Sequence, residues 1–255
     1  MPRVVGIDPG TVSFDLCGLE DGDPSFVDSL PTSEVVDDPA RLARAAGRRG
    51  PPDAVVGPSG YGLPLRRLEA LDEDDLRLAF LSRPGGTGGI PGLVEAVDGL
   101  RTLGCPVWLV PGVVHLPTVP PHRKVNRVDM GTADKLCAAA LGVVDQARRT
   151  GRPVDGTDFL LVELGGAFTS VLAVRGGAVV DGAGGSSGPP GVRAPGSLDG
   201  EVAVLLGRVT KRHVFDGGAL AVARGRRPAP GRPDAAGAER VPEGAPDHVP
   251  SRDGR

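Results

Sequence analysis

Residues 4–19, VVGIDPGTVSFDLCGL, and residues 160–174, LLVELGGAFTSVLAV, follow one plan. In each stretch a short apolar run ends in an acidic residue, Asp8 or Glu163, and a glycine turn leads into a second apolar run. Short apolar runs bounded by turn residues are typical of β-strands, and a third such run follows each pair. The repetition therefore predicts two related lobes, each opening with three successive strands.

The two turns carry residue types that can hold a phosphate and its metal ion. Mg²⁺ prefers carboxylate and phosphate oxygens and keeps several waters, so Asp8 and Glu163 are predicted metal ligands. Glycine amides and neighbouring hydroxyls can surround a phosphate. The predicted phosphate-binding residues are Gly10, Thr11, Ser13, Gly165, Gly166 and Thr169, and Ser170 offers a further hydroxyl in the second turn. A solvated acid in an ordinary hairpin turn explains either turn alone, whereas the repetition favours a nucleotide clamp.

The rest of the chain alternates helical and strand patterns. Helices are expected over 33–49, 65–81 (as one helix or a pair), 93–103 and 130–149, and strands over 54–57 and 106–111. The last of these helices, 130–149, has the most regular 3-4 spacing of apolar residues. The glycine-rich segment 184–191 is compatible with either a substrate loop or a flexible linker. This pattern predicts an α/β protein.

Composition excludes several classes of protein. The 255 residues include 40 Gly and 26 Pro but no Gly-X-Y period, and the net charge of −3 argues against a general nucleic-acid binder. No apolar run approaches the roughly 18 residues that span a membrane, and the start lacks a secretory pattern, so we expect a cytoplasmic protein. Residues 224–255 are rich in Arg, Pro and Gly, and we expect them to be disordered.

The motifs resemble those of a known superfamily. The two repeats resemble the first and second phosphate motifs of the acetate and sugar kinase, chaperone and actin ATPases, and NRVDMGTADK at 126–135 resembles their first connecting motif. The run from 3 to about 223 is similar to an uncharacterised prokaryotic family described as predicted butyrate kinases. The resemblance implies a ribonuclease-H-like (actin-like ATPase) fold, with a first lobe at 1–129 and a connecting helix and partial second lobe at 130–223.

The same resemblance implies an ATP-dependent kinase that uses ATP and Mg²⁺ on a small-molecule acceptor, with a short-chain carboxylate as one candidate. Asp8 and Glu163 would be catalytic through the metal, although Glu163 stands where most of these ATPases carry Asp. Asp129 and Asp134 are candidates for a base, or for acids that hold metal or structure. The basic residues Arg123, Lys124 and Arg127 can be read as substrate ligands or as a solvated loop. A homodimer is left open.

Two other functions remain open at this stage. GIDPGT also resembles Holliday-junction resolvases, in which Asp8 would be the first of several metal-binding acids of a nuclease. The acidic net charge and the second glycine turn speak against that alternative. The remainder of the second lobe that is expected after Ala223 is replaced by the tail, so a truncated, non-catalytic nucleotide-binding protein is the third possibility.

Overall fold

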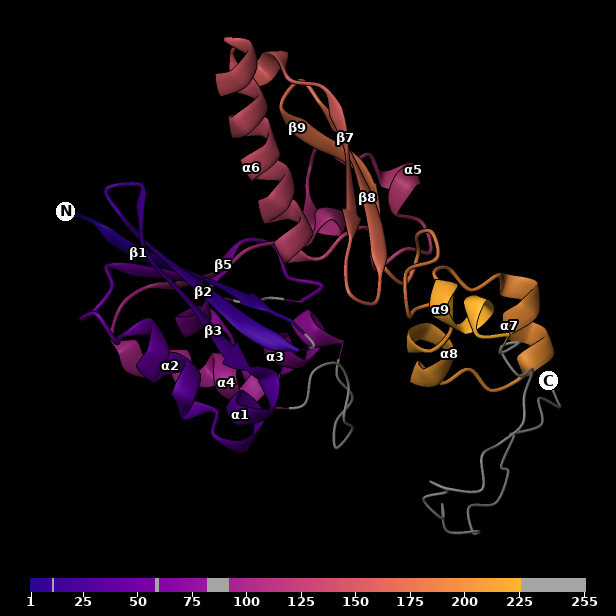
Figure 1. Ribbon diagram of the computed structural model, residues 1–255, viewed down its shortest axis with the longest axis horizontal. Helices are drawn as coiled ribbons and strands as arrows, with labels where there is room; N and C mark the ends of the chain where they lie inside the picture. The colour runs from indigo at the N-terminus through magenta and orange to yellow at the C-terminus, as the bar shows by residue number, and fades with distance from the viewer. Residues whose placement is uncertain (11, 58–59, 82–91, 226–255) are drawn as a thin grey trace, which may run out of the picture.

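The computed structural model describes residues 1–225 except 11, 58–59 and 82–91. The first lobe contains a six-stranded sheet of order β3-β2-β1-β4-β6-β5 (Figure 1). Its strands are β1 (Arg3–Pro9), β2 (Ser13–Glu20), β3 (Asp23–Pro31), β4 (Ala54–Gly57), β5 (Arg66–Arg67) and β6 (Val107–Leu109). Strands β1, β2 and β3 form an antiparallel meander, while β4 runs parallel to both β1 and β6.

Helices cover one face of this sheet (Figure 1). They are α1 (Thr32–Asp37), α2 (Ala40–Ala46), α3 (Glu73–Phe80) and α4 (Leu93–Gly99), with short 3-10 turns η1 (Leu68–Ala70) and η2 (Leu100–Leu103). Their apolar sides and the inner face of β1 form one core, in which Val5, Leu42 and Val97 are fully buried. This packing holds the carboxyl end of β1, and with it Asp8, in a fixed position.

The second lobe repeats the meander with fewer strands. Strands β7 (Phe159–Leu164), β8 (Thr169–Arg175) and β9 (Ala178–Ala183) form an antiparallel sheet of order β7-β8-β9. Helix α6 (Ala133–Thr150) lies along this sheet in Figure 1. The remaining elements are η3 (Val113–His115), α5 (Pro121–Lys124), η4 (Val154–Gly156), α7 (Gly200–Leu206), α8 (Lys211–Phe215) and α9 (Gly218–Ala223).

A second hydrophobic core joins α6 to β8 and β9. It contains Met130, Val143 and Leu172, and it also includes Val113 and Val119 from the segment that follows β6. Residues that precede the expected boundary at 129, among them Val113 and Val119, therefore already pack in the second core. Of the predicted tail, residues 226–255 lie outside the described part of the chain.

Two of the expected helices are different in the structure. The single helix expected over 33–49 is divided into α1 and α2, because Asp38 precedes Pro39 and takes an extended conformation with φ −141° and ψ 85°. In the 65–81 stretch only α3 is an α-helix, since Arg66 and Arg67 pair with β6 as a short strand. Helix α3 begins where the Asp72 carboxylate accepts a hydrogen bond from the backbone N–H of Asp75 at 2.8 Å.

The two meanders differ in how much of their apolar surface is covered. When Asp8 is matched with Glu163, Val5 and Ile7 correspond to Leu160 and Val162. The first pair is 0 % and 8 % exposed, whereas the second pair is 69 % and 56 % exposed. The helical layer that covers β1 therefore has no counterpart on β7 within the described residues.

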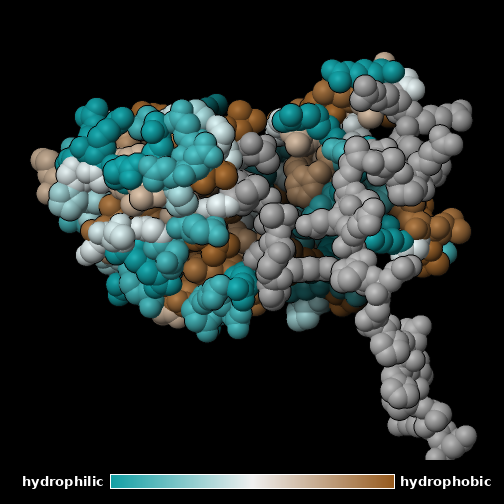
Figure 2. All heavy atoms as spheres, turned by 90° about the horizontal axis from the view of Figure 1, so that it is seen from below, coloured by the Kyte–Doolittle hydropathy of each residue, from teal (hydrophilic) through white to brown (hydrophobic). Residues whose placement is uncertain are grey.

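Further apolar surface lies on the three short helices α7–α9. Val204 and Leu205 of α7 are 75 % and 85 % exposed. Figure 2 shows hydrophobic atoms at the edge of the molecule on which α7–α9 lie. None of the helices in the described part of the chain is both long enough and apolar enough to cross a bilayer.

Candidate functional site

The two acid-glycine turns share a backbone hydrogen bond at equivalent positions. In the first, the N–H of Gly10 donates to the carbonyl of Ser13 at 2.8 Å, and in the second the N–H of Gly165 donates to the carbonyl of Phe168 at 2.9 Å. A Cβ at Gly10 would lie 2.6 Å from that carbonyl oxygen, and one at Gly165 would lie 3.1 Å from its counterpart. A side chain at Gly10 would clash with its turn, and one at Gly165 would require a small shift, while both amides are engaged within the protein.

Each acid faces a polar residue on the neighbouring strand. Asp8 pairs with Asp15 across β1 and β2, and Glu163 pairs with Ser170 across β7 and β8, at equivalent positions of the two meanders. Directly paired residues of an antiparallel sheet share one face, so Ser170 lies on the face of Glu163. Ser170 is 2 % exposed, and its Oγ has no hydrogen-bond partner among the described residues.

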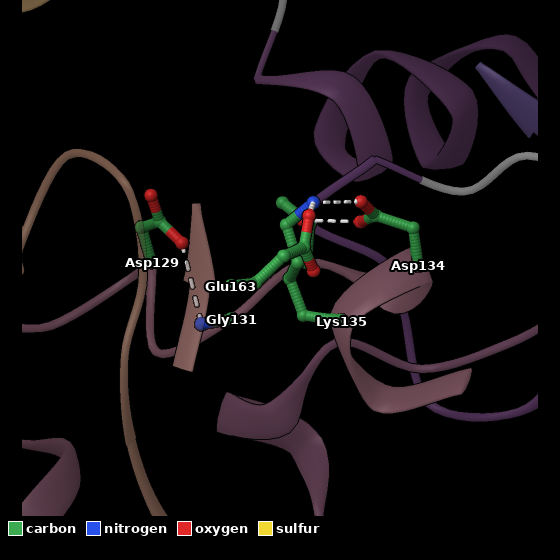
Figure 3. Close-up of polar contacts among 6 residues, drawn as sticks. Asp129, Gly131, Asp134, Lys135 and Glu163 are labelled. Atoms are coloured by element: carbon green, nitrogen blue, oxygen red, sulfur yellow. Dashed lines mark hydrogen bonds and ion pairs between the residues drawn. The ribbon is translucent and has the colours of Figure 1, made fainter. Parts of the chain in front are cut away.

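Lys135 connects the second turn to the start of α6 (Figure 3). Its Nζ donates to Asp134 Oδ2 at 2.5 Å and also to Glu163 Oε1. The second oxygen of Asp134 accepts from the hydroxyl of Thr132, which precedes the helix. The three charged side chains keep only 22–32 % of their surface exposed, so these ion pairs are more shielded from water than ordinary surface pairs.

The charges of both lobes influence one another at this point. Asp8 is exposed at the end of β1, but partial shielding from water by the surrounding protein raises its pKa, and the neighbouring charges of Asp134, Asp15 and Glu163 raise it further, whereas Lys135 lowers it. For Lys135, burial lowers the pKa of the ammonium, but the contacts with Asp134 and Glu163 outweigh it, so that the pKa is raised overall. Asp8, Asp134, Lys135 and Glu163 therefore form one electrostatic cluster, called here the lobe-junction cluster.

Asp129 lies apart from the lobe-junction cluster (Figure 3). It is 7 % exposed, and its carboxylate accepts from the N–H and the Oγ of Ser186, both at 2.8 Å, and from the N–H of Gly131 at 3.3 Å. Its backbone carbonyl accepts from the N–H of Gly184 at 3.1 Å and from the hydroxyl of Ser187. The 184–191 segment thus holds Asp129 instead of acting as a free linker.

The other predicted phosphate-binding residues are placed differently. The hydroxyl of Ser13 donates to Asp15 at 3.2 Å, close to Asp8. Thr169 pairs with Leu164, so its side chain lies on the face of the sheet opposite to Glu163. Gly166 accepts a hydrogen bond at its carbonyl from Arg193 Nε at 2.9 Å. Thr11 lies outside the described residues.

The three basic residues of segment 123–127 are engaged in structural contacts. They fasten this segment to β9 and to the backbone before α5, and none of them contacts the lobe-junction cluster in a described contact. Their partners are Asp181 for Arg123 at 3.1 Å, the Leu116 carbonyl for Lys124 at 2.8 Å and the Gly182 carbonyl for Arg127 at 3.3 Å.

The lobe-junction cluster fits a hydrated Mg²⁺ better than a metal enclosed by protein. No three His, Cys, Asp or Glu side chains come close enough to enclose a metal ion in the described part of the chain. Mg²⁺ is usually held by one or two carboxylates, its own waters and substrate phosphates, and Asp8, Asp134 and Glu163 offer such carboxylates from both lobes. The unpartnered Ser170 hydroxyl on the face of Glu163 adds an oxygen donor.

Sequence reasoning missed the role of Lys135. A signal for Lys135 was available, because only three of the 29 basic residues are lysines and one of them follows Asp134 in the connecting motif. Ser170 was expected as a hydroxyl of the second turn, and the structure places it opposite Glu163 as Asp15 is placed opposite Asp8. The chain's one tyrosine, Tyr61, also went unnoticed; burial and the charge of Asp129 raise its pKa, and a hydrogen bond with Ser186 opposes this.

Comparison with known families identifies the chain at the level of a family. Residues 6–230 match the family described as "Protein of unknown function (DUF1464)". The chain belongs to this family. No curated protein matches it at the significance required.

Likeness to a solved structure with a TM-score above 0.5 supports the fold of this DUF1464 protein. Acetate kinase from Porphyromonas gingivalis superposes with a TM-score of 0.54 at 14 % identity, over 88 % of this chain and 70 % of that one. Acetate kinase from Entamoeba histolytica gives a TM-score of 0.49 at 10 % identity, over 86 % of this chain and 67 % of that one. The expected ribonuclease-H-like, actin-like ATPase fold is confirmed, and at these identities the likeness is one of fold alone.

Proposed function

We propose that this chain is an ATP-dependent phosphotransferase that acts on a small-molecule acceptor, with short-chain carboxylates as the first candidates. The observation that supports the proposal is that the two turns, one in each lobe, share an equivalent backbone hydrogen bond and that the charge of Glu163 influences the pKa of Asp8. A likeness in fold to acetate kinase agrees with this proposal.

The residues of the lobe-junction cluster suit the demands of phosphoryl transfer. That reaction depends mainly on positioning and on neutralising the charge of the transferred group. Asp8 and Glu163 would hold a Mg²⁺ through direct or water-mediated contacts, and the metal would neutralise phosphate charge. Lys135 offers a mobile ammonium beside the same phosphates. The small number of lysines and histidines in the chain is therefore no obstacle.

The environment of Asp129 favours a carboxylate as the acceptor. A hydroxyl acceptor needs a base to take its proton, whereas a carboxylate attacks phosphorus without losing one. The Asp129 carboxylate already accepts three hydrogen bonds, two from Ser186 and one from Gly131, so it is poorly placed to take a proton from an acceptor. An acyl phosphate is then the expected product.

Calorimetry of ATP binding is the first test. In the presence of Mg²⁺ we expect the full chain to bind ATP, and we expect Asp8→Asn to weaken binding at least about tenfold, since a charged metal ligand is lost. The matched control is Asp23→Asn, which removes an exposed carboxylate at the other end of the same meander and should leave binding unchanged. Equal binding by wild type and Asp8→Asn would contradict the proposed role of Asp8.

Product formation is the second test. Purified protein is incubated with Mg²⁺, ATP and a panel of short-chain acids and sugars, and ADP release is measured. ADP with acids alone supports the carboxylate proposal, and ADP with sugars alone overturns that part of it. ATP binding without ADP from any acceptor would instead indicate a nucleotide-binding protein that does not catalyse transfer. Metal-dependent cleavage of branched DNA that Asp8→Asn abolishes would replace the kinase proposal with a nuclease.

A further inference from the structure

The Lys135 ammonium lies where two carboxylates converge from different elements. Asp134 belongs to the first turn of α6, and Glu163 lies near the end of β7. Both accept a hydrogen bond from the same Nζ, at 2.5 Å in the case of Asp134 (Figure 3). A third carboxylate, Asp8, interacts with the same group from the first lobe. One cation therefore balances three anions, which leaves the cluster with net negative charge.

A second observation shows that oxygen donors at this point are not all used. The Ser170 hydroxyl is buried, faces the same side of the sheet as Glu163, and has no partner in the described part of the chain. A buried hydroxyl without a partner is unfavourable by itself, and such groups in native proteins commonly meet a ligand or an ordered water. Ser170 thus leaves an unused oxygen donor on the Glu163 face.

We propose that Lys135 is a positioning residue that holds the place of a divalent cation between Asp134 and Glu163, so that cation binding and the Lys135 ion pairs exclude one another. When the cation binds, the lysine is released and its ammonium becomes free to contact an anion. The inference rests on the proposed function for the purpose of the site, but the competition between lysine and cation requires no nucleotide.

The residue type supports this role. Lysine carries a compact point charge on a flexible four-carbon stem, which can leave one position and reach another. Arginine, the basic residue that this chain otherwise uses, has a planar and more rigid head group. A residue that only stabilised the two carboxylates would keep its contacts when a divalent cation is added.

The test compares Mn²⁺ binding by the full chain and two variants, with electron paramagnetic resonance to count free Mn²⁺ and no nucleotide present. Lys135→Met removes the charge and retains the length of the side chain, and Lys135→Arg retains the charge. We expect Lys135→Met to bind Mn²⁺ about tenfold more tightly than wild type, since a competing positive charge within ion-pair distance is removed, and Lys135→Arg, which keeps that charge, to bind no more tightly than wild type. Unchanged Mn²⁺ affinity in a folded Lys135→Met variant would overturn the proposal.

A measurement on the wild-type chain keeps the proposal testable if Lys135→Met does not fold. The chain has three lysines, so acetylation of each by acetic anhydride can be followed by mass spectrometry. Saturating Mn²⁺ should accelerate acetylation of Lys135, while Lys211, which lies over the ring of Phe215, serves as the internal control. Acetylation of Lys135 at the same rate with and without Mn²⁺ would show that the cation does not displace it.

The outcomes separate this inference from the proposed function. If Lys135→Met gains Mn²⁺ affinity but the wild-type chain does not bind ATP, the competition holds and the kinase proposal fails. If the wild-type chain binds ATP with Mg²⁺ but neither Mn²⁺ measurement changes, the kinase proposal stands and Lys135 is only a structural ion-pair partner.

Discussion

Gly184→Ala tests whether the 184–191 segment is a structural clasp for Asp129. A Cβ at Gly184 would lie 1.7 Å from Asp129 Oδ1 and 2.3 Å from its Cγ, far closer than atoms in contact can approach. The carboxylate would have to turn away and lose its two hydrogen bonds from Ser186, each 2.8 Å long. Hydrogen bonds to a charged group contribute about 1.5–3 kcal/mol each, and partial relaxation of the loop recovers some of this. We therefore expect a loss of about 3 kcal/mol in the free energy of unfolding.

Thermal and urea unfolding followed by circular dichroism would measure this loss. For a chain of this size, about 3 kcal/mol corresponds to a fall of about 6–12 °C in Tm. Gly200→Ala is the matched control, because a Cβ there has nothing within 4 Å and Gly200 begins α7, where alanine is tolerated. If Gly184→Ala unfolds within about 0.5 kcal/mol of wild type, Asp129 is not held as described.

Two further predictions concern the two meanders. Val5→Thr places a hydroxyl in the first core, at a position that is 0 % exposed, and should lower the free energy of unfolding by about 1–3 kcal/mol. Val162→Thr, at a position that is 56 % exposed, should change it by less than about 0.5 kcal/mol. Urea unfolding of both variants measures this, and equal losses would contradict the difference in burial between the two strands. Because the folded pKa of Asp8 is raised, its ionised form opposes folding at neutral pH, so Asp8→Asn should raise Tm at pH 7. That gain should disappear as the pH falls below 3.8, the ordinary value of an aspartate, and a gain that persists at lower pH would refute the electrostatic explanation.

Local pattern was sufficient to predict the strands and the turns. The apolar runs that end at Asp8 and Glu163 predicted β1 and β7, and the glycines that follow predicted turns whose hydrogen bonds prove to be equivalent. These features depend on residues within a few positions of one another, so they can be predicted from the sequence. The division of α1 from α2 also has a local cause, because Pro39 disfavours a helical conformation of the residue before it, Asp38.

The contents of the site depended on contacts that span long distances in the chain. Lys135 and Glu163 are 28 residues apart, and Ser186 is 57 residues from Asp129. Nothing in the local pattern distinguishes an acid held by a distant serine from one that faces a ligand, so Asp129 and Asp134 could not be told apart from sequence. The structure separates them, because Asp134 joins the lobe-junction cluster and Asp129 does not (Figure 3).

The exposure of β7 shows why repetition in sequence does not guarantee repetition in packing. Leu160 and Val162 have the residue types of a buried strand, as Val5 and Ile7 do, yet burial requires a second layer on the same face. In the first lobe α1, α2 and α4 supply that layer, while in the second lobe the described helix that packs on β7, α6, covers the opposite face, beside Phe159. Glu163 is therefore anchored by one packed face and by Lys135, whereas Asp8 is anchored by a complete core. If Asp8 and Glu163 act together, the position of Glu163 depends more on its ion pair with Lys135 than the position of Asp8 does. Lys135→Met should therefore increase the motion of the Glu163 side chain far more than that of Asp8.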